Sequence, residues 1–193
     1  MHHIYHTEGI ILESRNFDEA GKYYFIFTRD FGMILASAQG VRKISSKLRF
    51  VLQDFAYLKI DLVKGKDFWK VTNASKTNML EGITKNKTNF RIFANISKLL
   101  RRLLAGEDPN ESLFDDFLSG LLILENSKTK EELHNIEVII VLRILSNLGY
   151  IGASEMFKTF IQSPFEPSLI YEMARSRKQI LQKINKILQE THL

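Results

Sequence analysis

A cluster of basic side chains between residues 40 and 49 carries the most distinctive chemistry of the sequence. The window of residues 31–53 contains no Asp or Glu, and its four cations are Arg42, Lys43, Lys47 and Arg49. Guanidinium and ammonium groups neutralise phosphate oxygens, so this composition suits a polyanion such as a nucleic acid. The plainer alternative is a solvated surface loop, because Lys and Arg are mostly exposed in any protein.

Aromatic side chains near this cluster could add base stacking to the charge. Barrels that bind single-stranded nucleic acid stack bases on exposed rings, which contributes about 1–3 kcal/mol per base. Tyr57 and Trp69 carry a polar atom on the ring, so we expect both to be half exposed and take them as candidate nucleic-acid contacts. Phe25 and Phe50 lack such an atom, and we expect them to point into the core.

No pattern in the sequence predicts a catalytic or metal site. His2, His3 and His6 lack the spacing of helical zinc ligands, and Asp115 and Asp116 are adjacent, so they point in different directions on a helix. Phosphate-binding, dinucleotide-binding and nucleophile-elbow glycine patterns are missing. The chain has no Cys, which excludes disulfides and a cysteine nucleophile. We therefore expect a protein that is not an enzyme and needs no cofactor.

The charge is distributed unevenly along the 193 residues. The net charge is +5, but residues 1–91 carry fifteen Lys and Arg against nine Asp and Glu, whereas residues 92–193 carry twelve against thirteen. The basic character therefore belongs to the first half, where it would attract anionic partners. No apolar run reaches the length of a membrane span and the N-terminus does not resemble a signal peptide, so we expect a cytoplasmic protein.

Five short strands are predicted in the first half, on both sides of the basic cluster. Their predicted ranges are 5–14, 22–28, 33–38, 51–63 and 69–75. In the fourth strand, Ala56, Leu58, Ile60 and Leu62 alternate with more polar residues and should face the core. Five such strands in about eighty residues indicate a small barrel, either of the oligonucleotide-binding (OB) type or of the SH3-like type.

The second half has helical periodicity. The predicted helices cover residues 86–105, 108–126, 129–148 and 168–190, with Asp108 as N-cap of the second and a Thr129–Glu132 capping box opening the third. Residues 136–148 are apolar almost all the way round, which is typical of the central helix of a bundle. We expect a strand domain at residues 1–78 and a helical domain at residues 79–193, because the period changes near this point.

A second group of cations lies on the more polar side of the first predicted helix. It consists of Arg91, Lys98, Arg101 and Arg102. These side chains could bind an acidic peptide of a partner protein, although an ordinary solvated helix face explains them as well.

The first domain contains a series of short fragments in a characteristic order: Thr7, Gly9–Leu12, Phe17, Glu19-Ala20, Phe27–Gly32, Ala38–Arg42, Ser46–Arg49 and Leu52–Phe55. In order and spacing these fragments resemble the RecO family of bacterial recombination mediators. The resemblance implies an α+β protein with an N-terminal five-stranded OB barrel and an all-α C-terminal domain. The Asn147–Tyr150 helix end is similar in layout.

The resemblance also implies a function. Such proteins bind single- and double-stranded DNA, anneal complementary strands and help to load the recombinase in recombinational DNA repair. They associate with RecR and with the acidic tail of single-strand binding protein, and their DNA-contacting loop maps onto Arg42, Lys43, Lys47 and Arg49. A cytoplasmic, nucleoid-associated location follows.

The sequence departs from the family in ways that qualify these expectations. Many members hold zinc with four cysteines after the segment equivalent to Gly149-Tyr150, and this chain has none, so no zinc is expected. Asp54 stands where proline is common, and Gly21 where a polar residue is usual. The chain is also short in its second half, which affects the tail-binding pocket most. An alternative function is a protein-interaction adaptor whose barrel binds no DNA.

Overall fold

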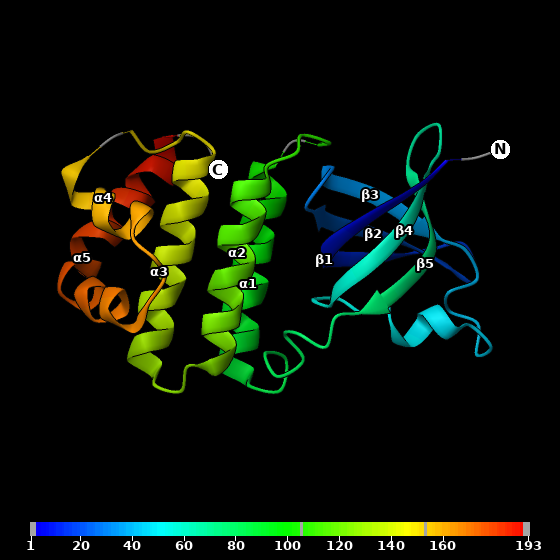
Figure 1. Ribbon diagram of the computed structural model, residues 1–193, viewed down its shortest axis with the longest axis horizontal. Helices are drawn as coiled ribbons and strands as arrows, with labels where there is room; N and C mark the ends of the chain where they lie inside the picture. Colours follow the sequence, from blue (N-terminus) through cyan, green and yellow to red (C-terminus); the bar gives the residue numbers. More distant parts are fainter. Residues whose placement is uncertain (1–2, 105, 153, 191–193) are drawn as a thin grey trace.

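Residues 4–76 contain five strands that close into a barrel (Figure 1). The computed structural model describes residues 3–104, 106–152 and 154–190. The strands are β1 (Ile4–Phe17), β2 (Gly21–Thr28), β3 (Gly32–Ala38), β4 (Tyr57–Lys64) and β5 (Trp69–Lys76), in the order β1-β2-β3-β5-β4 around the barrel. Four strand pairs are antiparallel, and a short parallel contact between β3 and β5 completes the closure.

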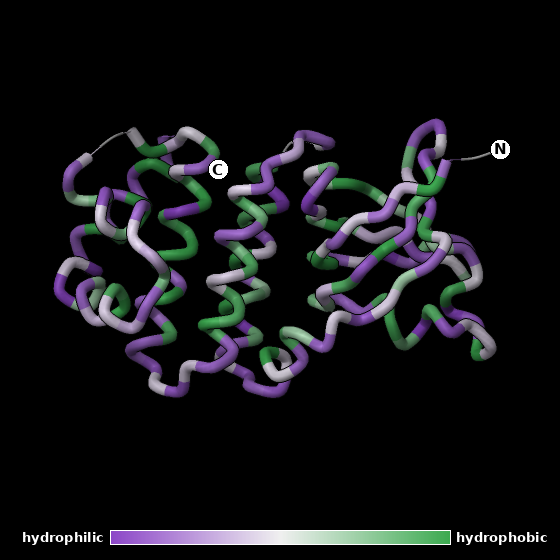
Figure 2. Tube along the Cα trace, in the orientation of Figure 1, coloured by the Kyte–Doolittle hydropathy of each residue, from purple (hydrophilic) through white to green (hydrophobic). Residues whose placement is uncertain are grey.

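The interior of the barrel is filled by alternate residues of each strand. Leu58, Ile60 and Leu62 of β4 are fully buried in this core, as their spacing predicts. Figure 2 shows the corresponding alternation of hydrophobic and hydrophilic residues along the strands. The predicted five-stranded barrel is therefore confirmed.

The fourth strand begins six residues later than its sequence pattern indicates. Residues Lys47–Phe50 form a short 3-10 helix, η1, and the chain then turns at Phe55, whose φ is +69°. A backbone in this left-handed conformation cannot continue an extended strand. The segment before Tyr57 therefore belongs to the loop between β3 and β4 and not to the sheet.

Five helices follow the barrel in the described part of the chain. They are α1 (Lys87–Leu103), α2 (Glu111–Asn126), α3 (Lys130–Asn147), α4 (Glu155–Gln162) and α5 (Pro167–Glu190). Figure 1 shows α3 between α2 on one side and α4 and α5 on the other, which explains why α3 is apolar almost all the way round. The predicted all-α second half is confirmed.

Of the two predicted helix N-caps, one is correct and one is wrong. The capping box of α3 is present, with Glu132 N donating to the Thr129 hydroxyl at 3.2 Å and Thr129 N donating to the Glu132 carboxylate. For α2 the predicted cap, Asp108, is wrong, since the Asn110 side chain accepts the hydrogen bond from Leu113 N at 2.9 Å. Asp108 instead lies in the α1–α2 loop, against the barrel at Gly32.

A second apolar core joins the outer face of the barrel to the helices. The outward-facing side chains of β1, β2 and β4, such as Ile10, Phe27 and Tyr57, are buried against α1 and α2. The Phe27 ring lies 5.3 Å from the Phe114 ring, centroid to centroid. The division at residues 78 and 79 stays a prediction, and this continuous core means that each part stabilises the other.

Candidate nucleic-acid interface

The basic loop, residues 39–56, connects β3 to β4 at one end of the barrel. It is held in successive tight turns by backbone hydrogen bonds such as Lys43 N to Gly40 O at 3.0 Å and Arg49 N to Ser46 O at 3.2 Å. Val41 and Leu52 anchor it, because both are buried in the core of the barrel. These contacts hold the backbone of the loop in place, while its other side chains extend from it.

The four cations of the basic loop are all exposed to solvent. Within the described residues none of them forms an ion pair with a carboxylate. Arg42 Nη1 donates a 3.4 Å hydrogen bond to the carbonyl oxygen of Asp18, and the Arg49 guanidinium lies 5.9 Å from the centre of the Phe50 ring. This end of the barrel thus carries positive charge that the protein itself does not neutralise.

Two large apolar side chains lie among these cations and are exposed. Ile44 is 89% exposed and Phe50 is 69% exposed. The expectation that Phe50 points into the core is wrong, because it lies in η1, where the side chain of this residue faces solvent, and not in a strand. A free ring beside Arg49 is suited to stacking on a nucleic-acid base.

Tyr57 is buried, so the expectation of a half-exposed ring is wrong. It is only 5% exposed, because α2 covers the outer face of β4 and places Phe114 6.2 Å from the Tyr57 ring. Its hydroxyl donates a 2.6 Å hydrogen bond to Glu8 Oε2. Burial, together with this carboxylate, raises the pKa of Tyr57 to about 12. The polar atom is satisfied inside the protein, and the ring cannot stack on a base.

Trp69 is also buried, at 2% exposure, which corrects the second half-exposed prediction. Its ring packs among Tyr5 and Phe31, and its indole nitrogen donates a 2.8 Å hydrogen bond to Glu107 Oε1 in the α1–α2 loop. Lys64 Nζ lies 3.0 Å from the other oxygen of the same carboxylate. Trp69 therefore joins the barrel to the helices and offers no surface for stacking.

Arg101 differs from the other cations of α1. Its guanidinium lies 3.3 Å from the centre of the Phe25 ring and forms a 3.2 Å ion pair with Glu13 of β1. It is therefore part of the contact between α1 and the barrel and is not available to a partner peptide. Phe25 is partly buried by this contact.

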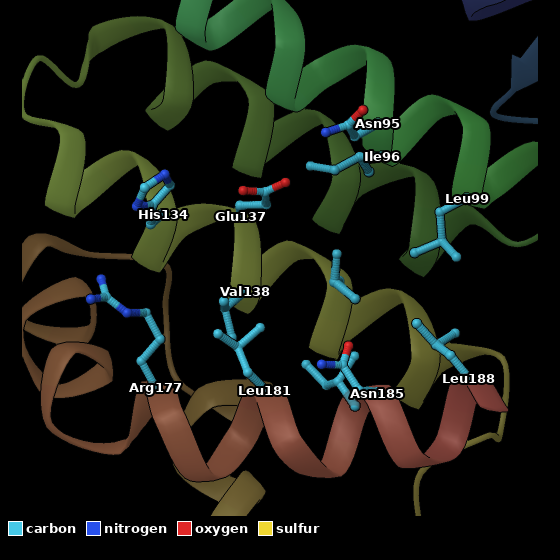
Figure 3. Close-up of a pocket in the computed structure, with 12 residues that line it drawn as sticks. Asn95, Ile96, Leu99, His134, Glu137, Val138, Arg177, Leu181, Asn185 and Leu188 are labelled. Atoms are coloured by element: carbon cyan, nitrogen blue, oxygen red, sulfur yellow. The ribbon is translucent and has the colours of Figure 1, made fainter. Parts of the chain in front are cut away.

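Arg91, Lys98 and Arg102 remain exposed on α1. Their spacing of seven and four residues places them on one side of the helix. This is the side of Asn95, which borders a groove of about 410 Å³ between α1, α3 and α5 (Figure 3). Apolar side chains of α3 and α5, such as Val138 and Leu181, line much of the groove.

Three titratable side chains also lie in this groove. Figure 3 shows Glu137 and His134 on α3, with Arg177 across from them on α5. Burial raises the pKa of Glu137, and the nearby Arg91 opposes the change. Burial, followed by the positive charges of Arg177, Lys130 and Arg91, lowers the pKa of His134. The groove thus combines an apolar floor with cations at its edges.

Residues 3–104, 106–152 and 154–190 contain no group of three or more His, Asp or Glu side chains arranged to hold a metal ion. His2 of the N-terminal histidine group lies outside these residues. Among the described helices, none is long and apolar enough to cross a membrane.

Comparison with known proteins links both halves of the chain to one family. The family model described as Recombination protein O N terminal matches residues 1–80, and the model described as Recombination protein O C terminal matches residues 89–151. DNA repair protein RecO of Heliobacterium modesticaldum is 29% identical over 147 residues, which cover 76% of this chain and 52% of that protein.

Two further relatives agree with this match. DNA repair protein RecO of Acetivibrio thermocellus is 28% identical over 144 residues, which cover 75% of this chain and 57% of the relative. The protein of the same name from Thermodesulfovibrio yellowstonii is 28% identical over 150 residues, with coverage of 76% and 58%. The chain spans about half the length of the curated relatives it matches.

Proposed function

The chain belongs to the RecO family, and from this membership we propose that it is a DNA-binding mediator of recombinational DNA repair that acts without catalytic turnover. It binds single- and double-stranded DNA, anneals complementary strands and helps to load the recombinase. The observation that supports this proposal best is the basic loop, whose four exposed cations have no carboxylate partner among the described residues.

The proposed mechanism is electrostatic. Cations of the basic loop neutralise backbone phosphates and release the counterions that had been condensed on the DNA, so affinity falls as salt rises. Two strands held at the same positive surface repel one another less, and their base edges remain free to pair. The loop presents no recognisable pair of side chains for reading base edges, so binding is independent of sequence.

Removal of the four charges tests this proposal. For Arg42, Lys43, Lys47 and Arg49 all changed to Gln, each lost phosphate contact should lower the salt slope by about 0.7 on single strands, or about 2.8 in total. When salt rises from 50 to 200 mM, the variant should therefore lose about 50-fold less affinity than the parent protein does, and it should bind more weakly than the parent at every salt concentration. Fluorescence anisotropy with oligonucleotides of two unrelated sequences measures both effects.

A matched control removes the same charge elsewhere. Lys128, Lys158, Lys178 and Lys186 are exposed on the helical half, and their joint change to Gln should alter the slope little. If both variants bind DNA like the parent, the loop is not the interface. If the parent protein itself binds no DNA at low salt, the adaptor alternative is correct, and the barrel does not bind DNA.

The helical half is proposed to bind the protein partners, RecR and the acidic tail of single-strand binding protein. The groove between α1, α3 and α5 suits the acidic tail, because Lys98, Arg102 and Arg177 can pair with its carboxylates and the apolar floor can take its hydrophobic residues. Glu137 lies in the same groove, and the nearby Arg91 acts on its carboxylate. The proposed location is cytoplasmic and nucleoid-associated.

A further inference from the structure

A separate cavity lies where β2 meets the basic loop. Its volume is about 340 Å³. Buried side chains of Tyr24, Val41 and Leu52 form its floor, and Arg42 and Arg49 reach it from the loop. Lys22, from β2, is partly buried at the same cavity.

The Tyr24 hydroxyl in the floor of this cavity has no hydrogen-bond partner in the described part of the chain, although the side chain is fully buried. A buried hydroxyl without a partner is rare in folded proteins, and one that lines a cavity can donate to an acceptor that enters it. Burial, and then the negative charge of Asp54, raises the pKa of Tyr24. The hydroxyl therefore stays protonated at neutral pH and can donate.

The charged groups around the cavity are mainly cations. Lys22 Nζ donates to Ser14 Oγ at 3.2 Å, which holds the ammonium group near the start of β2. Arg42 is held through its hydrogen bond to Asp18 O, and Gln53 Nε2 donates to Arg49 O. Asp54 is the carboxylate that acts on Tyr24, and its side chain is exposed. Three cations and one hydroxyl donor thus line the same cavity.

We propose that this cavity binds one phosphate group of a DNA strand, with the Tyr24 hydroxyl donating to a phosphate oxygen and Lys22, Arg42 and Arg49 neutralising its charge. A hydroxyl donor surrounded by cations matches an anion, whereas the edge of a base would need acceptors as well as donors. The inference rests on the proposed DNA binding by the basic loop and adds to it a defined pocket. The phosphate can be a terminal monoester or an internal diester of the strand.

The change Tyr24→Phe tests the pocket, because it removes only the unpartnered hydroxyl. We expect unchanged or higher thermal stability, about tenfold weaker oligonucleotide binding, and an unchanged salt slope because no charge is lost. Tyr23→Phe is the matched control on the neighbouring residue and should alter none of these. Lys22→Gln provides a second variant and should lower the salt slope by about 0.7 on single strands.

Oligonucleotides with a 5′-phosphate, a 3′-phosphate or only hydroxyl ends distinguish the two sources of phosphate, with inorganic phosphate as competitor. A loss confined to a phosphorylated end identifies a terminal monoester, and an equal loss for all three identifies an internal diester. If Tyr24→Phe and Lys22→Gln both bind every oligonucleotide like the parent while the loop variant loses binding, the pocket is wrong and the loop proposal stands. Unchanged binding by the loop variant contradicts the basic loop as the interface, and no DNA binding by the parent protein contradicts the proposed function itself.

Discussion

Two glycines with the same backbone conformation should respond very differently to alanine. Gly32 and Gly40 both have φ of +66°, a region in which an L side chain is strained by about 1 kcal/mol. A Cβ on Gly40 would meet only the flexible Lys43 side chain, at 3.8 Å. A Cβ on Gly32 would lie 2.7 and 2.8 Å from the backbone C and N of Asp108, so the α1–α2 loop would have to move.

Moving this loop would weaken the hydrogen bonds that hold it against the barrel. Met33 N donates to Gly106 O at 3.1 Å, and Glu107 accepts hydrogen bonds from Trp69 and Lys64. Losing the backbone bond costs about 1 kcal/mol and weakening the bonds to the carboxylate about 1–2 kcal/mol more. Together with the strain, Gly32→Ala should cost about 3–4 kcal/mol in unfolding free energy, against about 1 kcal/mol for Gly40→Ala.

Thermal unfolding followed by circular dichroism measures the difference. For a chain of this length, 1 kcal/mol corresponds to about 2–4 °C, so we expect a decrease in Tm of about 2–4 °C for Gly40→Ala and about 6–16 °C for Gly32→Ala. Urea unfolding gives an independent value of the free energy. Equal losses in the two variants would refute the reasoning, because backbone strain alone would then account for both and the docking of the α1–α2 loop would contribute nothing.

Two further predictions concern binding. Phe50→Ala should weaken single-strand binding by about 1–3 kcal/mol per stacked base while leaving Tm unchanged, as measured by anisotropy; the exposed Tyr171→Ala on α5 is the control, and an equal effect of both would exclude stacking. The double change Lys98→Glu and Arg102→Glu should abolish binding of an acidic peptide at low salt, because it reverses two charges beside the groove. The peptide is synthetic, with consecutive Asp residues and an apolar end, and its binding is measured by calorimetry. If the parent protein does not bind the peptide, the groove is not the site for the acidic tail.

The sequence predicted best where a local pattern decides the structure. The alternation of Leu58, Ile60 and Leu62 specifies one buried face, and the spacing of Thr129 and Glu132 is enough to cap a helix. Both signals are complete within a few residues. For this reason the barrel, the helices and the exposed basic loop could be expected before any tertiary contact was known.

Some of the wrong predictions depend on partners that are distant in sequence, and others on short local elements that leave no clear period. The polar atom of Trp69 indicated a half-exposed ring, but Glu107, 38 residues away, accepts its hydrogen bond inside the protein. Arg101 has the pattern of a solvated helix residue, yet it pairs with Glu13 of the barrel. Phe50 was misplaced because η1 interrupts the strand period. The short α4 was missed because its eight residues are too few for a clear period.

The shared core also has a consequence for how the chain is made. All five strands are complete at Lys76, but the ring of Phe117, which packs on Phe27, is 41 residues further along the chain. At about 5–20 residues per second, the ribosome needs about 2–8 s to add that segment. Throughout this interval the nascent barrel carries an uncovered patch that includes Ile10, Phe27 and Tyr57. Apolar surface that is exposed in this way promotes aggregation, so this interval is a vulnerable stage of synthesis.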